Sequence, residues 1–274
     1  MRPDLIHIGG YTVHAYAAAI VLAFVVCSLM GLRDAARYRG LYGSPLFCVI
    51  VLLAALMGAR FAALWQMGAY REFWRALILW DSGMVFYGGL VGGVLAGLIY
   101  VLIRKFPPLQ VADVAAPYMA LGEMFGRIGC FLNGCCWGKV SALPWAMGFP
   151  RASYPFRHQV QEHMLVVDAD ASLPVHPTQL YMAAGLLLMF FLLRHLMKKR
   201  IAAGGVILLY VFLHGCLRFT VEFFRADNAH TYGPFTTSQV FSLALLLGAA
   251  AGLGAWWWNK DRTGLTAQAD THAN

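Results

Sequence analysis

The chain of 274 residues is 60% hydrophobic and only 12% charged, whereas an ordinary soluble domain carries roughly 25% charged residues. This composition excludes a soluble globular protein, because no core of this size holds so much apolar surface, and it favours lipid as the surrounding solvent. The formal charge is +8, but no zinc finger, RNA-binding signature or long basic stripe accompanies it, so we expect no nucleic-acid partner.

Apolar runs long enough to cross a bilayer, roughly 20 residues each, recur along the chain. We place them near 11–31, 46–67, 84–103, 111–133, 179–197, 203–224 and 238–258. The expected fold is an all-α membrane protein with about seven transmembrane helices. We expect helices one to four in 1–138, a head loop in 139–178, helices five to seven in 179–260 and a disordered tail in 261–274.

Basic residues are distributed unevenly between the two sides of these spans. The denser clusters, at 33–39, 104–105, 194–200 and 260–262, follow the first, third, fifth and last spans. The opposite side carries fewer basic residues: Arg2, Arg71, Arg75, Lys139, Arg151 and Arg157. The positive-inside rule then predicts an outer N-terminus and a cytoplasmic C-terminus. This orientation puts the loop 139–178 on the outer face as a small head.

The third span contains glycines at intervals of four residues. Gly89, Gly93 and Gly97 form one such series, and Gly88 and Gly92 form another. Glycines stacked in this way let a neighbouring helix approach closely. We interpret them as a helix-packing surface, with a smooth groove for a lipid chain as the alternative.

Ionisable side chains inside a membrane cost about 2.5–3.5 kcal/mol on insertion scales, so each one needs a physical reason. Arg218 and Glu222 are four residues apart in the sixth span, and so are Glu123 and Arg127 in the fourth. One interpretation is two internal ion pairs that neutralise each other. In the other interpretation Arg127, Arg218 and Arg225 lie near the outer ends of their spans, outnumber the two carboxylates and bind a phosphate bidentately.

The stretch 126–139 reads GRIGCFLNGCCWGK and is the most specific segment of the chain. Its glycines accompany Arg127, Asn133 and Lys139 at the end of a span. Glycines let the chain turn and expose backbone N–H groups, as anion sites require. A simple turn needs neither an arginine nor an asparagine at membrane depth, so the segment predicts an anion site.

This stretch resembles the signature of the prolipoprotein diacylglyceryl transferase family, which usually reads G-R-x-G-N-F-x-N-G-E-x-x-G-R. Other parts of the chain resemble further motifs of the family in the same order. They are HAY at 14–16 for H-W-Y, GMVFYGG at 83–89 for G-x-S-F-H-G-G, Asp113 with Pro117 for D-x-x-A-P, HPTQLY at 176–181 for H-P-[ST]-Q-L-Y, and RFTVEFFR at 218–225 for R-x-x-x-E-F-F-R. The resemblance runs from roughly residue 14 to residue 240.

The resemblance implies an enzyme that transfers the diacylglyceryl group of phosphatidylglycerol to the thiol of the lipobox cysteine in prolipoprotein signal peptides. A thioether forms and glycerol-1-phosphate leaves, at the outer leaflet of the bacterial plasma membrane. Neither a metal nor another cofactor is implied. The expected partners are therefore phosphatidylglycerol, lipobox signal peptides and the lipid bilayer.

The same resemblance assigns residues to the site. Arg127, Arg218 and Arg225 are expected to hold phosphate while Glu222 orients an arginine, and Tyr87 is expected where the thiol meets the lipid. The catalytic residues are thus Arg127, Arg218, Tyr87 and Glu222. The expected substrate-binding residues are Tyr16, Asn133, Gly138, Arg225, His176, Gln179 and Tyr181.

The chain departs from the family pattern where protons are handled. Tyr87 stands in place of the histidine commonly favoured as the base, and Cys130 and Cys135 replace the Asn and Glu of the signature. The acceptor thiol must lose its proton to become a nucleophile. A neutral phenol is a poor base and a good donor, so we expect Tyr87 to act as a hydrogen-bond donor or as an electrostatic partner of the thiolate. Positive charge from the arginines keeps a base role open.

Cys130, Cys135 and Cys136 form a C-x4-C-C group within the signature. This is not a standard zinc spacing, so we expect no metal. A structural role, or a disulfide from Cys130 to Cys135 or Cys136, suits an oxidising outer space, and a reactive thiol is the alternative.

Two further function classes remain beside the transferase hypothesis. One is a phospholipid-binding relative with a different acceptor or no transferase activity. The other is a thiol-redox membrane protein that uses the three clustered cysteines, although the chain has no C-x-x-C pair.

Overall fold

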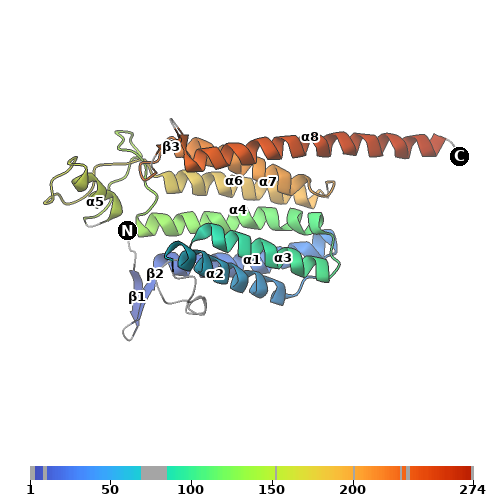
Figure 1. Ribbon diagram of the computed structural model, residues 1–274, viewed down its shortest axis with the longest axis horizontal. Helices are drawn as coiled ribbons and strands as arrows, with labels where there is room; N and C mark the ends of the chain where they lie inside the picture. Colours follow the sequence, from blue (N-terminus) through green and yellow to red (C-terminus); the bar gives the residue numbers. More distant parts are fainter. Residues whose placement is uncertain are drawn as a thin grey trace. The chain divides into compact units, whose positions relative to one another are not determined.

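The computed structural model describes residues 4–8, 11–68, 85–151, 153–199, 201–228, 230–232 and 235–272. The described part of the chain is helical, with two short antiparallel hairpins (Figure 1). Its elements are β1 (Asp4–Ile8), β2 (Tyr11–His14), α1 (Ala15–Arg39), α2 (Pro45–Gln66), α3 (Phe86–Ile103), α4 (Pro108–Asn133), α5 (Tyr154–Gln161), α6 (Thr178–Lys198), α7 (Gly205–Glu222), β3 (His230–Tyr232), β4 (Phe235–Thr236) and α8 (Thr237–His272).

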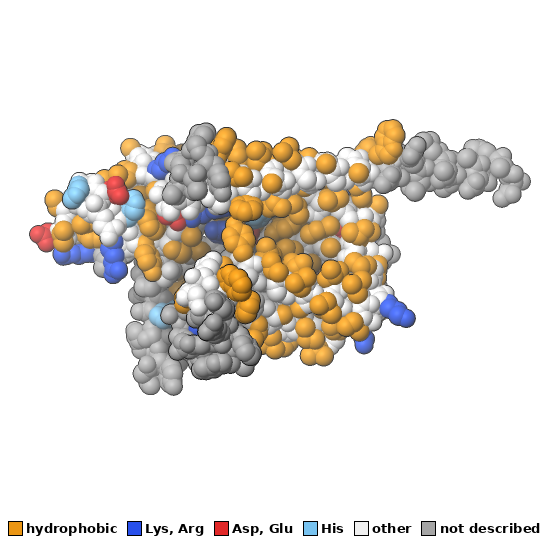
Figure 2. All heavy atoms as spheres, in the orientation of Figure 1, with side chains coloured by type: hydrophobic (Ala, Val, Ile, Leu, Met, Phe, Trp, Pro, Cys, Tyr) orange, Lys and Arg blue, Asp and Glu red, His pale blue; other side chains and the backbone are white. Residues whose placement is uncertain are grey.

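The length and hydropathy of the helices identify a multi-pass membrane protein. Five described helical segments are long and apolar enough to cross a bilayer: α1, α2, α6, α7 and Thr237–Trp258 of α8. A shorter apolar helix covers Tyr87–Ile103. Apolar side chains cover much of the helical surface in Figure 2, and large ones such as Leu29, Ile103 and Leu188 are more than 60% exposed. Lipid is the solvent that makes such exposure favourable.

The chain divides into two units, and the smaller one comprises Ser28–Ala112. Within it, α2 and α3 pack backbone against backbone. A methyl group on Gly58 or Gly88 would overlap the carbonyl oxygen of the other, and one on Gly92 would overlap the carbonyl oxygen of Ala54. The close approach requires glycine at these positions, as in other small-residue helix contacts. Gly88 and Gly92 therefore serve helix packing, the first of our two interpretations.

The larger unit comprises Met1–Cys27 and Asp113–Asn274. In it α7 packs between α6 and α8 (Figure 1). Asp113 of α4, fully buried, accepts hydrogen bonds from the backbone nitrogens of Gly204 (2.8 Å), Val206 (3.1 Å) and Ile207 (3.0 Å). The carboxylate thus accepts hydrogen bonds from N–H groups that have no helical partners in the first turn of α7. Its negative charge also interacts favourably with the positive end of the helix dipole. This contact fixes α7 against α4.

The segment predicted as a head, 139–178, is folded rather than an open loop. It contains α5 and short antiparallel bridges that join Val140 and Met147 to Val175. Phe149 and Phe156 are buried, with exposures of 0% and 5%. A small apolar core therefore stabilises this segment between α4 and α6.

Two predicted boundaries differ from the structure. Residues 11–14 form β2, so the first helix begins at Ala15 and not near residue 11. The β-branched Thr12 and Val13 favour a strand over a helix there. At the other end α8 continues to His272, beyond residue 260 where we expected a disordered tail. Ala267, Gln268 and Ala269 favour helix, and no proline interrupts the segment.

Candidate functional site

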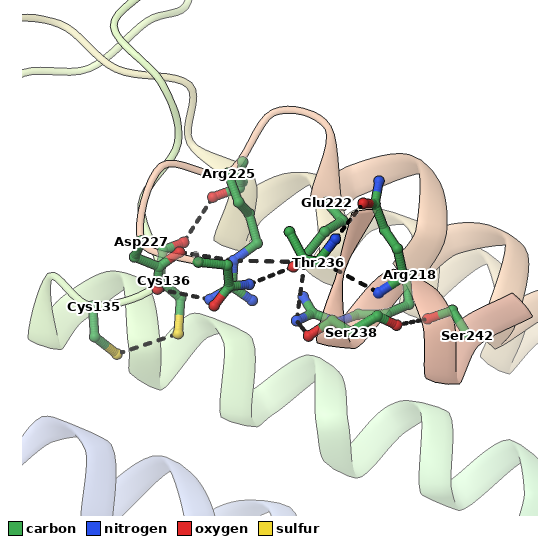
Figure 3. Close-up of polar contacts among 12 residues, drawn as sticks. Cys135, Cys136, Arg218, Glu222, Arg225, Asp227, Thr236, Ser238 and Ser242 are labelled. Carbon is green, nitrogen blue, oxygen red and sulfur yellow. Dashed lines mark hydrogen bonds and ion pairs between the residues drawn. The ribbon is translucent and has the colours of Figure 1, made fainter. Parts of the chain in front are cut away.

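The C-terminal end of α7 carries a buried carboxylate between two arginines. Glu222 is 3% exposed, and its Oε2 atom lies 3.0 Å from Nη2 of Arg218 and 3.9 Å from Nε of Arg225. Spacings of four and three residues put the three side chains on one side of the helix end. A charge buried this deeply is stable only when it is paired, so Glu222 holds both guanidinium groups in place (Figure 3).

The chain that follows α7 completes this group. Thr236 donates from Oγ1 to Oε1 of Glu222 over 2.7 Å, and Asn228 donates from Nδ2 to the same oxygen. Arg218 donates from Nη2 to Oγ of Ser238 over 2.9 Å (Figure 3). The connection to α8 and the first turn of α8 therefore position Glu222 and Arg218 together.

Asp227 supplies a third carboxylate, which was not predicted from the sequence. It accepts from Nε and Nη2 of Arg225 at 2.9 and 2.7 Å, the bidentate geometry of a strong pair. Burial lowers the pKa of Arg225, but the hydrogen bond to Asp227 and the negative charges of Asp227, Cys136 and Glu222 together keep it above its usual value. The predicted surplus of arginines over carboxylates was therefore wrong, because Arg127, Arg218 and Arg225 face three carboxylates and not two.

Arg218 keeps one unused donor group. Its Nη2 atom donates to Ser238 and forms an ion pair with Glu222, while its Nη1 atom is buried and has no hydrogen-bond partner among the described residues. A buried donor without an acceptor costs about 1–3 kcal/mol, so such a group in a native structure calls for an explanation. An anionic ligand oxygen would satisfy it.

A second charged group joins α4 to α7. Arg127 donates from Nε and Nη2 to Oε1 of Glu123 at 3.2 and 2.7 Å, and Nε2 of His214 lies 2.8 Å from Oε2. The charges of Arg127 and Glu123 act on Arg218, so the two groups form one electrostatic cluster. His214 was not among the residues predicted from the sequence. Its signal was its position one helical turn before Arg218, on the same side of an otherwise apolar span.

The part of the signature that follows α4 is held by backbone pairing on both sides. Gly138 donates its N–H to the carbonyl of His176 over 3.1 Å and forms a bridge with Arg225. Lys139 donates its N–H to the carbonyl of Phe224 over 2.8 Å. The structure thus brings the signature, the HPTQLY motif and the end of α7 together, although they are far apart in the sequence.

Three predicted substrate-binding residues, at the start of α6 and just before it, contact protein groups. Nδ1 of His176 lies 3.1 Å from the hydroxyl of Tyr181, and that hydroxyl accepts from Nε1 of Trp145 over 2.8 Å. Gln179 is 1% exposed and donates from Nε2 to the carbonyl of Cys135 over 2.6 Å. Thr178, which we did not predict, donates to the carbonyl of Cys136 over 2.7 Å. These residues hold the signature segment against α6.

Cys130, Cys135 and Cys136 form a compact cluster at the end of α4. All three are free and partly accessible, and their sulfur atoms lie within 4.8 Å of one another. The Sγ atoms of Cys135 and Cys136 are 3.8 Å apart (Figure 3). Hydrogen bonds from the Cys130 and Cys135 thiols, with the charges of the arginines, lower the pKa of the Cys136 thiol. Thiolate character is thus favoured at Cys136 and disfavoured at Cys130 and Cys135.

The remaining predicted residues lie on α1, α3 and α4. Tyr16 is 43% exposed and packs on Gly129, where a Cβ atom would stand 3.0 Å from its ring. Asn133 is the last residue of α4. Tyr87 belongs to the smaller unit and is 58% exposed, and its place at the meeting point of thiol and lipid stays a prediction.

Comparison with known proteins agrees with the motifs. The family described as prolipoprotein diacylglyceryl transferase matches residues 3–258. A phosphatidylglycerol–prolipoprotein diacylglyceryl transferase of Clostridium tetani is 30% identical over 96% of this chain and 98% of its own length. Enzymes of the same name from Gloeobacter violaceus and Thermotoga maritima are 30% and 32% identical, over 94% and 89% of this chain and 93% and 80% of their own lengths. This chain therefore belongs to the prolipoprotein diacylglyceryl transferase family.

Proposed function

We propose that the protein transfers the diacylglyceryl group of phosphatidylglycerol to the lipobox cysteine of prolipoproteins. Membership of the family and the names of relatives that match nearly the whole chain support this activity. The structural observation that carries the proposal is the Nη1 atom of Arg218, which has no hydrogen-bond partner in the described part of the chain and is held beside Glu222 in a cluster of three arginines. This donor would bind a phosphate oxygen of the lipid.

The reaction needs a stabilised leaving group. The acceptor sulfur forms a bond to the glyceryl carbon while the carbon–oxygen bond to the phosphate breaks, and negative charge grows on the departing phosphate. Fixed positive groups aimed at developing charge are an efficient means of catalysis. Arg218 and Arg127 would supply them, and Glu222 would orient Arg218. Because Nε and Nη2 of Arg225 already donate to Asp227, Arg225 would contribute mainly its positive charge and not hydrogen bonds to the phosphate.

The other predicted residues would shape the lipid and peptide sites. Asn133, within the signature segment, and Tyr16, which packs on Gly129 of the same segment, would contact substrate. Gly138, His176, Gln179 and Tyr181 would act through position, because their contacts hold the signature segment and the end of α7 together. We propose that Tyr87 lies where the acceptor thiol meets the lipid, and that it acts as a hydrogen-bond donor or an electrostatic partner of the thiolate.

We further propose seven transmembrane helices, which adds α3 and α4 to the five apolar spans. The distribution of basic residues supports an outer N-terminus and a cytoplasmic C-terminus in a bacterial plasma membrane. The folded segment 139–178 would then be a head on the outer face, between helices one to four in 1–138 and helices five to seven in 179–260. Residues 261–274 would be a cytoplasmic tail. Labelling of single introduced cysteines from either side of the membrane tests this orientation.

The decisive test is lipidation by purified protein. A fluorescent lipobox peptide is incubated with the protein in phosphatidylglycerol vesicles, and the thioether product and glycerol-1-phosphate are both measured. We expect the two products in equal amounts, and none with a peptide whose cysteine is serine. Glycerol-1-phosphate without a lipidated peptide would indicate a different acceptor, and the absence of both products from folded protein would contradict the proposal.

A further inference from the structure

His214 of α7 and Glu123 of α4 form a carboxylate–histidine pair. Nε2 of His214 lies 2.8 Å from Oε2 of Glu123, and the other oxygen, Oε1, accepts from Arg127. Because an ionised carboxylate only accepts hydrogen bonds, Nε2 of His214 must carry a hydrogen atom. In the neutral imidazole the lone pair then lies on Nδ1. The contact with Glu123 thus fixes both the tautomer and the orientation of the ring, as a carboxylate does in a catalytic triad.

The Nδ1 atom of His214 is placed to accept a proton. Within the described ranges this atom has no hydrogen-bond partner, and the aromatic ring packed on the imidazole is that of Tyr210, with 5.7 Å between the ring centroids. The His214 side chain is 23% exposed, so a substrate group can reach it. Histidine is the side chain most often used as a general base, because it takes up and releases a proton near neutral pH.

His214 also has a suitable place relative to Arg218. Both lie on the same side of α7, and four residues of helix rise about 6 Å. In the proposed orientation, His214 is the deeper of the two in the membrane. The attacked glyceryl carbon of the lipid lies between the phosphate and the acyl chains, so it is deeper than a phosphate bound at Arg218. A thiol that attacks this carbon opposite the departing oxygen therefore approaches at the depth of His214.

We propose that His214 is the general base of the transfer: its Nδ1 atom takes the proton of the lipobox cysteine, while Glu123 holds the ring and stabilises the imidazolium that forms. This inference rests on the proposed function. It assigns a proton acceptor in a chain that has Tyr87 where the family has a histidine. Tyr87 then remains a hydrogen-bond donor or an electrostatic partner of the thiolate.

The proposed step needs no oxidant, reductant or further reactant. The thiol proton moves to Nδ1 of His214, and an electron pair of the sulfur forms the bond to the glyceryl carbon. The carbon–oxygen bond breaks with its electron pair on the phosphate oxygen of glycerol-1-phosphate. The imidazolium then releases its proton to water at the outer face, and the neutral ring is restored for the next acceptor.

The charged and titratable groups around His214 come from both helices. Glu123 and Arg127 face it from α4, while Tyr210 and Arg218 lie one turn away on either side along α7. Neither α6 nor α8, which also pack on α7, contributes an ion pair or a hydrogen bond to His214 within the described ranges. Glu123 is therefore shared by a permanent cation, Arg127, and a ring that becomes cationic when it takes the proton. A carboxylate fixed beside that ring stabilises the charge that develops during the step.

The test uses an acceptor that needs no base. His214→Gln keeps a side-chain N–H that can reach Glu123, so Glu123 and Arg127 should stay in place. With a lipobox cysteine peptide at neutral pH, its transfer rate should fall about 100-fold or more, because general-base catalysis contributes about 10²–10⁴. The same peptide with selenocysteine is already ionised at neutral pH. His214→Gln should therefore transfer to it within about threefold of the wild-type rate.

The pH dependence gives a second readout from the same variant. Above the reference thiol pKa of about 8.5 the cysteine peptide is largely ionised without help, so the defect of His214→Gln should shrink as the pH rises. The matched control is His195→Gln, at an exposed histidine near the C-terminal end of α6, which should behave like wild type with both peptides. The ratio of the cysteine and selenocysteine rates is taken within one preparation, so it does not depend on the folded fraction.

Three outcomes overturn the base role while the proposed function stands. They are an equal loss of both rates in His214→Gln, a full rate of His214→Gln with the cysteine peptide, and a defect that stays constant with pH. If His214→Gln does not fold, His214→Ala with added imidazole replaces it, and imidazole should raise its cysteine rate at least about tenfold. Failure of imidazole to raise the rate of folded His214→Ala overturns the role as well. Wild-type protein that lipidates neither peptide overturns the proposed function, and the base role with it.

Discussion

Gly138 lies against His176 so closely that no side chain fits between them. A Cβ atom on Gly138 would stand 2.6 Å from both the Cβ and the carbonyl oxygen of His176, and 2.7 Å from the carbonyl oxygen of Phe224. Two of these neighbours are backbone atoms and cannot rotate away. The contact is needed because Gly138 pairs with both neighbouring segments and so fixes the signature beside the arginine cluster.

We therefore expect Gly138→Ala to separate these segments. Overpacking of this kind costs typically 1–3 kcal/mol, so the thermal unfolding midpoint in detergent should fall by several degrees. Lipidation per folded molecule should fall as well, because the signature moves relative to Arg225. Gly248→Ala is the control, since a Cβ atom there meets nothing within 4 Å. Equal midpoints for the two variants would contradict the positioning role of Gly138.

Arg218→Ala should abolish transfer, and Arg218→Lys should not restore it. A lysine cannot contact Glu222 and Ser238 and still present a second donor in the plane of a guanidinium group. Removing one donor to a developing oxyanion costs about 10²–10³ in rate. The initial rate of glycerol-1-phosphate release measures the loss. Arg151→Ala, at an exposed arginine 3.5 Å from Asp168, should keep the wild-type rate. Activity of Arg218→Lys within threefold of wild type would exclude the two-donor role.

Glu222→Ala should unfold the site, whereas Glu222→Gln should preserve much of it. Removal of the carboxylate leaves Arg218 without its ion-pair partner, and breaking a buried pair in this way costs about 3–5 kcal/mol. Glutamine still accepts hydrogen bonds from Thr236 and Asn228. Thermal unfolding should rank wild type above Glu222→Gln and both above Glu222→Ala. The reverse order of the two variants would show that the hydrogen bonds accepted from Thr236 and Asn228 do not stabilise the site.

Much of the helical architecture could be predicted from the sequence, because apolar length and basic flanks are local properties. The grouping of Arg218, Glu222 and Arg225 followed from helical spacing, and the structure places them together. Asp227 and His214 could not be assigned in this way. Asp227 reaches Arg225 only because the chain turns after α7, and His214 meets Glu123 across two helices. Such contacts depend on tertiary packing, which spacing along one helix does not encode.

The hydrogen bonds between Asp113 and the start of α7 provide a stability prediction outside the charged cluster. The carboxylate of Asp113 accepts three backbone hydrogen bonds. In Asp113→Asn the NH2 group of the amide would face backbone N–H groups, which are donors themselves. Hydrogen bonds to a charged group contribute about 1.5–3 kcal/mol, and the loss is larger at a fully buried position. We expect a lower unfolding midpoint and faster hydrogen exchange at the start of α7. Asp170→Asn, at an exposed aspartate, should change neither quantity.

Substitution of Tyr87 distinguishes two ways in which the acceptor thiol could be activated. It stands where the family has a histidine, at the start of α3, and it is 58% exposed. If its hydroxyl donates to the thiolate or to the lipid, Tyr87→Phe should lower the transfer rate by a similar factor at every pH, and Tyr87→His should retain part of the activity. If it accepts the proton instead, the wild-type rate should rise with an ionisation that disappears in Tyr87→Phe.

The measurement is a pH–rate profile of wild type, Tyr87→Phe and Tyr87→His with one lipobox peptide, whose own thiol titration is determined separately and subtracted. We expect parallel profiles for wild type and Tyr87→Phe, offset by roughly 10-fold to 100-fold, since a hydrogen bond to a charged group such as a thiolate is worth about 1.5–3 kcal/mol. Tyr42→Phe, at a more exposed tyrosine of the same unit, should follow the wild-type profile. Full activity of Tyr87→Phe across the pH range would remove Tyr87 from the mechanism.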